Sequence, residues 1–467
     1  MWRIVNGSRA RRPLLVASAV LGAAVLAGGA GLGSYAVTGQ VHHAKPAART
    51  TYAPSVPSAL AGATASPAAA ASSNGAAAAA SGVSRALADL VTAPGLGGRL
   101  AGQVTDVATG TTLYTRSAGT AVAPASTAKL LTAAAILSVH RPLDTFVTRV
   151  VAGPGKAVTI IGGGDPTLSG AAAGKSGYYR GAARISDLAA ALHAAGVHPT
   201  RIYVDDGLFA GPGVSPHWAA DDVPSTYASP ITALMVDGGR AHPTDGELTT
   251  TPDIAAGEAL AAALGTSSLP VSRGSAPKGA RLLASVRSAP VSTLVTEMLQ
   301  LSDNVIAEVL GRQVALATSR PASFTGAAAA IRTVLRGLGI DPGAGMVDAS
   351  GLAAGDRLSA HTLADLVRLI AGPEHPELHD IVAALPVAGW SGTLADRYLS
   401  GSARAGAGVV RAKTGTLTGV SSLAGLVHDK SGRLLAFAFL AAGVASTPAA
   451  DAALDDLAAR LARCGCG

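Results

Sequence analysis

The stretch that decides the fold is LAGQVTDVATGTTLYT, residues 100–115. Two runs rich in Val, Leu and Thr flank a turn at Ala108-Thr109-Gly110, and this pattern predicts two antiparallel strands. Three further apolar runs lie near the other end of the chain, at residues 409–418, 421–428 and 434–440. Helical sequence separates the two groups, so we expect one antiparallel sheet assembled from both ends of the chain.

Apolar periodicity predicts helices that would flank this sheet. They lie at residues 125–139, 293–317, 327–338 and 362–371, and a polar interruption divides the second. The last helix is expected to begin with Thr447 as its N-cap and Pro448 as its first residue. Leu454, Leu457 and Leu461 then form one apolar stripe that should cover a face of the sheet.

The sequence from residue 141 to 276 has a different character from the rest. It mixes short strands, such as residues 201–205, with loops rich in Gly and Pro. We expect it to be one inserted domain, which divides the main body into residues 84–140 and 277–467. A chain of 467 residues is long enough for such an arrangement.

Ser126 and Lys129 lie at the start of the first predicted helix, in PASTAKLL, residues 124–131. Residues three apart on a helix share one face, so the amine can reach the hydroxyl. Serine is a weak nucleophile until a neighbouring base accepts its proton, and a lysine with a lowered pKa can be that base. On its own the spacing is common, and a capping serine beside a solvated lysine is the ordinary interpretation.

Two more motifs change that interpretation. The sequence Ser-Asp-Asn at residues 302–304 interrupts a helical pattern, where three polar residues would face a cleft or cap a new helix. The sequence Lys-Thr-Gly-Thr at residues 413–416 lies within a predicted strand. Glycine inside a strand often marks the close approach of another backbone, and a lysine with threonines suits a carboxylate.

In this order, Ser-x-x-Lys, Ser-Asp-Asn and Lys-Thr-Gly form the signature of active-site serine penicillin-recognising enzymes. The chain resembles the low-molecular-mass (class C) penicillin-binding proteins of the D-alanyl-D-alanine carboxypeptidase/endopeptidase family, in the branch with an insertion between the first two motifs. The separation of 176 positions from Ser126 to Ser302 fits that branch, and the likeness runs over residues 84–443. Other segments that resemble the family are residues 164–168, 227–230, 348–352 and 385–390.

The resemblance implies an α+β fold of the penicillin-binding-protein/β-lactamase-like transpeptidase type. It would have a five-stranded antiparallel sheet flanked by helices, an all-α subdomain and one inserted domain. The implied activity is that of a serine D-Ala-D-Ala carboxypeptidase, with possible endopeptidase activity, that cleaves peptidoglycan stem peptides through an acyl-enzyme. β-Lactam antibiotics would acylate the same serine as covalent inhibitors.

The resemblance also implies a role for each catalytic residue. Ser126 would attack the carbonyl between the last two D-alanines, and Lys129 would accept its proton. Ser302 and Lys413 would relay that proton to the leaving D-alanine, while Lys413 would keep Lys129 neutral by like-charge repulsion. Asn304 would hold the peptide amide of the substrate.

The third motif would complete the substrate site. The backbone amides of Ser126 and Thr416 would form the oxyanion hole. Thr414 and Thr416, on either side of Gly415, would bind the terminal carboxylate. No cofactor or metal is expected, because Pro376 interrupts the histidine-rich residues 374–380 and would break a helix that presented ligands.

A second part of the substrate site is implied by position in the family. Asp222 and Tyr227 match residues that in relatives line a pocket for the free end of diaminopimelate, with Leu417 and Thr418 at its floor. Relatives carry an arginine soon after their Ser-Gly-Leu sequence. This chain departs from them, because its next arginine in that region is Arg357.

Three alternatives share these motifs. A serine β-lactamase needs fast deacylation, which one class obtains from a Glu-x-x-x-Asn loop after the second motif, and no such loop is found. A β-lactam sensor needs a cytoplasmic output domain, for which twelve residues before the first apolar segment leave no room. A catalytically silent penicillin-binding wall protein stays open.

The N-terminal residues predict export. Arg3, Arg9, Arg11 and Arg12 precede the uncharged residues 13–37, which is typical of a signal peptide or membrane anchor within residues 1–40. Residues 41–83, rich in Ala, Pro and Ser, predict a disordered linker. The enzyme is therefore expected outside the cytoplasm, secreted or anchored facing the cell wall, with membrane contact only through this segment.

Charge and cysteine content limit the other partners. The net charge is +7, but no later basic cluster is interleaved with aromatics, so no nucleic-acid binding is expected. The only cysteines are Cys464 and Cys466. They exclude a disulfide-rich scaffold, and a loose tail is favoured over a small ring.

Overall fold

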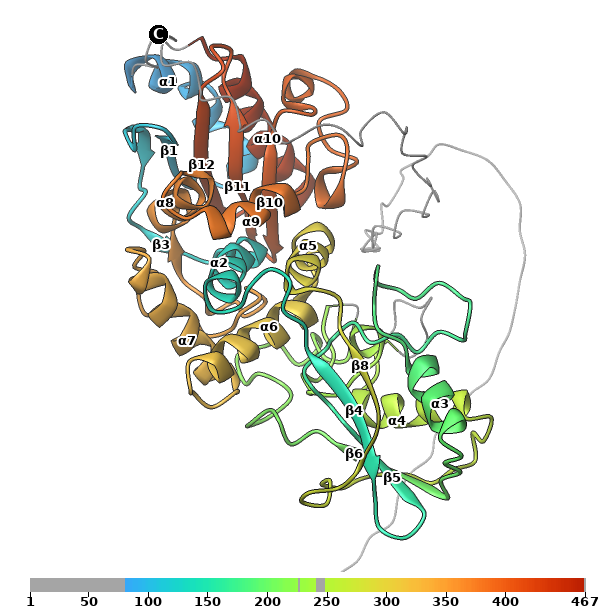
Figure 1. Cartoon of the computed structure of the whole chain (residues 1–467). Helices are drawn as coiled ribbons and strands as arrows, with labels where there is room; N and C mark the ends of the chain where they lie inside the picture. Colours follow the sequence, from blue (N-terminus) through green and yellow to red (C-terminus); the bar gives the residue numbers. More distant parts are fainter. Residues whose placement is uncertain (1–79, 226, 241–247, 466–467) are drawn as a thin grey trace, which may run out of the picture. The chain divides into compact units, whose positions relative to one another are not determined.

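The computed structural model describes residues 80–225, 227–240 and 248–465 (Figure 1). Its main sheet has the order β10-β11-β12-β1-β2, and every neighbouring pair is antiparallel. The strands are β1 (Arg99–Asp106), β2 (Thr112–Arg116), β10 (Arg411–Leu417), β11 (Val420–His428) and β12 (Leu434–Ala442). The predicted sheet built from both ends of the chain is therefore confirmed.

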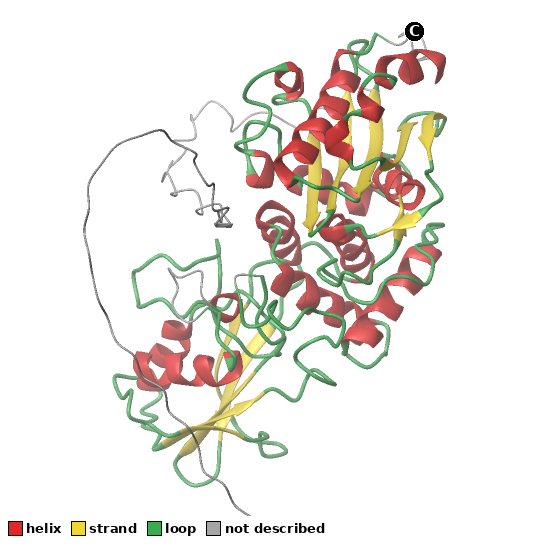
Figure 2. Cartoon of the chain, turned by 180° about the vertical axis from the view of Figure 1, so that it is seen from behind, coloured by secondary structure: helices red, strands yellow, loops and turns green. Residues whose placement is uncertain are grey.

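Helices cover both faces of this sheet (Figure 2). On one face, α10 (Thr447–Arg463) buries Leu454, Leu457 and Leu461 in a cluster with Phe437 and Phe439. On the other, α8 (Ala360–Ala371) and α2 (Lys129–Val139) share a core with the alternate residues of β11 and β12. The central strands β1, β11 and β12 are buried on both sides because each face has a helical partner.

The cap of α10 corrects one prediction. Ser446, rather than Thr447, is the N-cap residue, and its side chain accepts a hydrogen bond from the Ala449 amide. Thr447 and Pro448 are the first two helical residues. Both serine and threonine suit this position, so the sequence left the choice between neighbours open.

The helical layer beside the sheet carries the first two motifs. It contains α2, α5 (Val291–Leu301), α6 (Asn304–Ala317), α7 (Phe324–Gly337) and the short α9 (His379–Ala384). The predicted polar interruption is the junction of α5 and α6. Ser302 ends α5 in a left-handed conformation with φ of 56°, and Asp303 caps α6.

We refer to residues 141–290, between α2 and α5, as the intermotif segment. It forms a second sheet of order β7-β6-β5-β4-β8, with strands β4 (Val147–Ala152), β5 (Ala157–Ile161), β6 (Arg201–Asp205), β7 (Val271–Arg273) and β8 (Leu282–Arg287). Two helices pack on it, α3 (Ile185–Ala194) and α4 (Pro252–Ala263). Because β8 pairs with β4, this sheet extends to Arg287, past the predicted border at residue 276.

The edges of the described chain add two findings. Helix α1 (Ala80–Leu87) begins inside the predicted linker, and Val83 is fully buried, so the linker prediction is wrong for residues 80–83. At the other end Cys464 is buried and disulfide-bonded, so the loose tail is wrong for this residue. Away from the ends, β3 (Ala121–Val122) and β9 (Leu358–Ser359) pair in a small two-stranded sheet.

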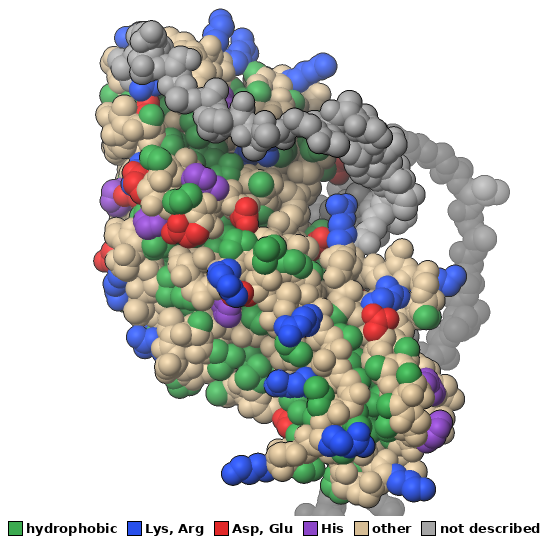
Figure 3. All heavy atoms as spheres, in the orientation of Figure 1, with side chains coloured by type: hydrophobic (Ala, Val, Ile, Leu, Met, Phe, Trp, Pro, Cys, Tyr) green, Lys and Arg blue, Asp and Glu red, His purple; other side chains and the backbone are tan. Residues whose placement is uncertain are grey.

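The predicted export segment and residues 41–79 lie outside the described residues. Within the described part of the chain, no helix combines the length and apolar character needed to cross a bilayer. On the face seen in Figure 3, Lys and Arg side chains are scattered over the surface rather than gathered in one patch.

Candidate active site

The Ser126 hydroxyl and the Lys129 amine lie together at the start of α2. Residues Ala125–Ala128 form a 3-10 turn that leads directly into the helix. The Lys129 Nζ donates to Ser126 Oγ at 2.9 Å. Lys129 is fully buried while Ser126 keeps partial exposure, so a substrate can approach the hydroxyl and the amine stays out of water.

The junction of α5 and α6 faces this pair. Asn304 Oδ1 accepts a hydrogen bond from Lys129 Nζ at 2.6 Å, and Asn304 Nδ2 donates to the Tyr227 carbonyl at 3.0 Å. Ser302 Oγ accepts from Lys413 Nζ at 2.9 Å. The left-handed turn at Ser302 therefore joins two residues that contact two different lysines.

Strand β10 forms the edge of the main sheet and carries the third motif. A Cβ atom added to Gly415 would lie 2.9 Å from the Ser126 nitrogen and 2.8 Å from the Pro124 carbonyl oxygen. Only glycine lets the strand approach the serine this closely, as its position in the strand predicted. Thr414 Oγ1 bonds Thr393 Oγ1 at 2.8 Å, and Thr416 is exposed.

Both lysines have lowered pKa values. Burial lowers the pKa of Lys129 from 10.5 to about 8, although the carboxylates of Asp348, Glu308 and others nearby partly restore it. Burial, and then the charge of Lys129, lower the pKa of Lys413 well below its ordinary value. The expected cause for Lys129 is thus corrected: burial dominates its shift, and the repulsion between the amines acts on Lys413.

A buried carboxylate network behind Lys129 was missed by the sequence reasoning. Asp348 accepts hydrogen bonds from the amides of Ser350, Gly351 and Ala353 and from the Trp218 indole. Glu308 on α6 accepts from the Ser350 amide at 2.8 Å. These bonds aim the Ser350 carbonyl at Lys129 Nζ, 2.7 Å away. The only sequence signal was the likeness of residues 348–352 to the family.

The four residues expected to line the diaminopimelate pocket differ in their contacts and in their exposure. Tyr227 is beside the motifs through its carbonyl, while its side chain is 53% exposed. Leu417 packs against the apolar cluster that contains Trp218 and Ala228, and Thr418 is exposed. Asp222 Oδ2 accepts a local hydrogen bond from the Ala219 amide.

Arg357 is the next arginine after residues 350–352. Its Nη1 donates to the carbonyls of Ala354 and Asp356 in its own loop.

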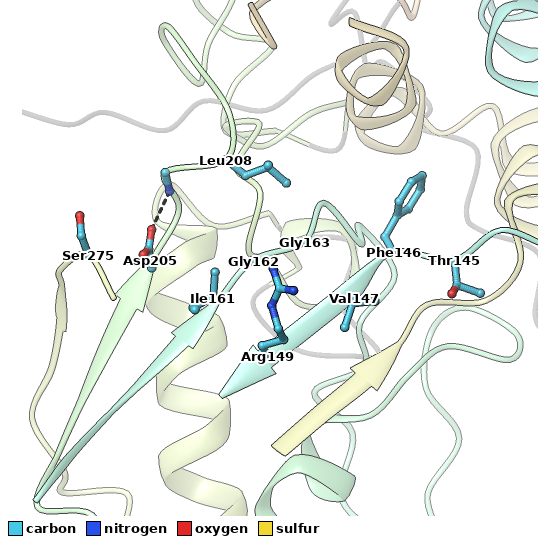
Figure 4. A pocket seen from close by; sticks show the side chains of 11 residues that line it. Thr145, Phe146, Val147, Arg149, Ile161, Gly162, Gly163, Asp205, Leu208 and Ser275 are labelled. Carbon is cyan, nitrogen blue, oxygen red and sulfur yellow. Dashed lines mark hydrogen bonds between the residues drawn. The ribbon is translucent and has the colours of Figure 1, made fainter. Parts of the chain in front are cut away.

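One surface pocket lies away from the three motifs. It has a volume of about 620 Å³ and is lined by Phe146, Arg149, Ile161, Asp205 and other residues of the intermotif segment (Figure 4). Asp205 Oδ1 accepts from the Gly207 amide at 3.0 Å, the dashed line in the figure. None of the motif residues lines this pocket, so we place the chemistry where the motif residues contact one another around Ser126.

The fold and the contacts of the motif residues together define a serine penicillin-recognising enzyme: an antiparallel sheet between helices, with Ser-x-x-Lys, Ser-Asp-Asn and Lys-Thr-Gly in mutual contact. The model of the D-Ala-D-Ala carboxypeptidase 3 (S13) family matches residues 83–247 and 247–464, and the chain belongs to this family. It is a serine-type carboxypeptidase, a hydrolase.

Known proteins agree with this membership. A carboxypeptidase of Mycobacterium tuberculosis is 45% identical over 392 residues, which are 82% of this chain and 84% of that protein. The carboxypeptidase DacB of Mycolicibacterium smegmatis is 44% identical over 394 residues, 83% and 85% of the two chains. The crystal structure of penicillin binding protein 4 from Haemophilus influenzae superposes with a TM-score of 0.66 at 22% identity, over 81% of this chain and 98% of that one.

Proposed function

We propose that this enzyme removes the terminal D-alanine from peptidoglycan stem peptides by way of an ester on Ser126. The observation that carries the proposal is the contact of Lys129 Nζ with Ser126 Oγ at 2.9 Å inside a buried site. A fully buried amine with a pKa near 8 can lose its proton near neutral pH, and a neutral amine can activate a serine.

Acylation begins when Lys129 accepts the Ser126 proton. The freed oxygen forms a bond to the carbonyl carbon of the penultimate D-alanine, and the backbone amides of Ser126 and Thr416 stabilise the resulting oxyanion. The C–N bond then breaks, and its amine takes a proton relayed through Ser302 and Lys413. The 2.9 Å contact between those two side chains supports the relay.

Deacylation reverses the proton movements. A water molecule gives one proton to neutral Lys129 and attacks the ester carbon. The Ser126 oxygen then recovers a hydrogen as the shortened peptide leaves. Asn304 holds the substrate amide, and Thr414 and Thr416, on either side of Gly415, bind the free carboxylate. A β-lactam forms the same ester, but its leaving amine stays attached, which favours a long-lived adduct.

The remaining parts of the chain are given roles that fit this activity. Residues 1–40 direct export or anchor the enzyme outside the cytoplasm, and the following residues up to α1 separate it from the membrane. The intermotif segment acts as one inserted domain. Asp222, Tyr227, Leu417 and Thr418 line the site for the side chain of the third stem-peptide residue.

The test is to incubate the purified full-length enzyme with a stem pentapeptide and with cross-linked muropeptides, and to identify the products by mass spectrometry. We expect release of D-alanine from the pentapeptide. Cleaved cross-links would add endopeptidase activity, since both reactions cut the bond after a D-alanine. A preparation that forms a penicillin adduct but releases no product from either substrate would contradict the proposal and favour a silent binding protein.

A further inference from the structure

Asp303, the middle residue of the second motif, is held from outside the three motifs. Its Oδ1 accepts the Ile306 amide at 3.0 Å, which caps α6. Its Oδ2 accepts the Tyr179 hydroxyl at 2.7 Å, and Arg240 Nη2 lies 3.8 Å from the same oxygen. Capping a helix requires only one carboxylate oxygen, so the contacts of Oδ2 are additional to the cap.

Tyr179 and Arg240 form one rigid unit with Asp303. Arg240 Nη1 donates to the Tyr179 hydroxyl at 2.9 Å and to the Asp237 carbonyl at 2.7 Å, and its guanidinium lies 3.6 Å from the centre of the Tyr178 ring. The side chains of Arg240 and Asp303 are only 13% and 7% exposed. Because the phenol accepts from the arginine and donates to the aspartate, its orientation is fixed.

The ionisation of Tyr179 suits this donor role. Burial, and then the charge of Asp303, raise the pKa of Tyr179 well above its ordinary value. The hydroxyl therefore keeps its hydrogen throughout the pH range in which the enzyme would work.

Asp303 lies in the sequence between two residues that contact the lysines of the site. Its two neighbours are Ser302, whose hydroxyl bonds Lys413, and Asn304, whose amide bonds Lys129. A rotation of the peptide units at residue 303 would displace both side chains at once. Displacement of a catalytic group by about 1 Å can cost about 100-fold in rate.

Tyr179 and Arg240 belong to the intermotif segment, which contacts α6 at several other places, two of them through Asn304 and Gln313. The Tyr227 carbonyl accepts from Asn304, and the Gly163 carbonyl accepts from Gln313 Nε2 at 2.9 Å. The geometry points to a positioning role for this segment: Tyr179 and Arg240 hold Asp303, and through it Ser302 and Asn304, in the reactive arrangement. This inference rests on the proposed function of the motifs.

The test is Tyr179→Phe, measured by the rate of acylation with a labelled penicillin. We expect the acylation rate constant to fall about tenfold, since one hydrogen bond to a charged group is lost. The fall should lie in the bond-forming step and leave the initial binding constant unchanged. Tyr203→Phe is the matched control, because it removes a phenol hydroxyl from β6 of the same segment, away from Asp303, and it should react like the wild type.

A double-mutant cycle separates positioning from general support of the fold. Asp303→Asn keeps an oxygen for the Ile306 amide, but its nitrogen cannot accept from Tyr179. If Tyr179 acts through Asp303, the double variant should be no slower than the slower single variant. Losses that multiply, or a wild-type rate for Tyr179→Phe, would overturn the inference.

Two further measurements cover the cases in which Tyr179→Phe does not fold or the enzyme is inactive. If Tyr179→Phe does not fold, Arg240→Lys tests the same unit, since it keeps the charge but loses the paired donors; a wild-type rate there would overturn the inference. A wild-type enzyme that neither reacts with penicillin nor releases D-alanine would instead refute the proposed function.

Discussion

Lys129 and Lys413 make similar hydrogen bonds, but the charged groups around them have opposite signs. Each is fully buried, and each bonds a serine hydroxyl at 2.9 Å, Lys129 with Ser126 and Lys413 with Ser302. The charges that act on Lys129 are carboxylates, with Asp348 and Glu308 the largest. Those that act on Lys413 are the cations Lys129 and Arg397.

This difference decides where the proton sits. Burial disfavours the charged form of both amines, but the carboxylates leave Lys129 with a pKa of about 8, while Lys413 is pushed well below its ordinary value. A proton on the pair is therefore held more readily by Lys129 than by Lys413. Lys413 lies beside Ser302, where it can take part in proton transfer to the leaving group.

The largest effect should come from Ser126→Ala, which removes the nucleophile. We expect penicillin acylation and D-alanine release to fall by about 10⁴-fold or more. A labelled-penicillin gel assay and product chromatography measure the two losses. Thermal unfolding should stay close to that of the wild type, and a stable ester at any other serine would contradict the assignment.

Replacing each lysine in turn tests the comparison directly. Lys129→Met should cost about as much as Ser126→Ala, because nucleophile and base act as a unit. Lys413→Met should cost less, about 100-fold, since Lys413 contacts Ser302 rather than the nucleophile. The acylation rate constants of the two variants, each compared with the wild type, give the two losses.

The reverse order would break the comparison, since it would make Lys413 the base that activates Ser126. Circular dichroism on both variants controls for unfolding.

Gly415→Ala tests the closeness of β10 to the serine. Its Cβ would meet the Ser126 nitrogen at 2.9 Å, so strand or turn must shift. We expect a loss of about 1–3 kcal/mol in unfolding free energy and a fall of about 100-fold or less in acylation. Denaturant unfolding and penicillin labelling measure the two effects.

Gly102→Ala is the control for Gly415→Ala. Its Cβ would press on the Phe439 ring within the same sheet, away from the serine. It should lower stability and leave the acylation rate of the folded protein unchanged. Equal effects on acylation in the two variants would show that the sheet as a whole, and not the approach to Ser126, sets the rate.

The sequence predicted the parts of the molecule that depend on local patterns. The alternating runs around residues 100–115 and 409–440 predicted the main sheet, and three short motifs predicted which side chains meet. The buried carboxylates could not be found this way. Glu308 reads as one polar residue on a helix, and its partner Ser350 lies 42 residues further along the chain.

The same reasoning explains the other omissions. Tyr179 lies 124 residues before Asp303, and nothing local indicates that the two meet. The last strand of the second sheet, β8, pairs with β4 across more than a hundred residues, so the predicted border stopped short of it. Ser446 and Thr447 both belong to the residue types common at N-caps, and the geometry of α10 shows that Ser446 is the cap.

The smallest effect, and the finest test of the two environments, is the pH dependence of acylation. The reactive form needs neutral Lys129, so the acylation rate should rise with pH and reach half its maximum near pH 8. Burial, and then the charge of Asp348, raise the pKa of Glu308 to about 8, so its charge develops over the same pH range in which Lys129 loses its proton. Glu308→Gln removes that charge, while its Oε1 can still accept from the Ser350 amide. The midpoint should then move to lower pH by about one unit or less, bringing Lys129 closer to the condition of Lys413. Stopped-flow acylation between pH 6 and about 10 measures the shift, with Tyr203→Phe as a control variant that leaves these charges in place. A midpoint that stays fixed or moves upward would mean that Glu308 carries no charge that Lys129 senses.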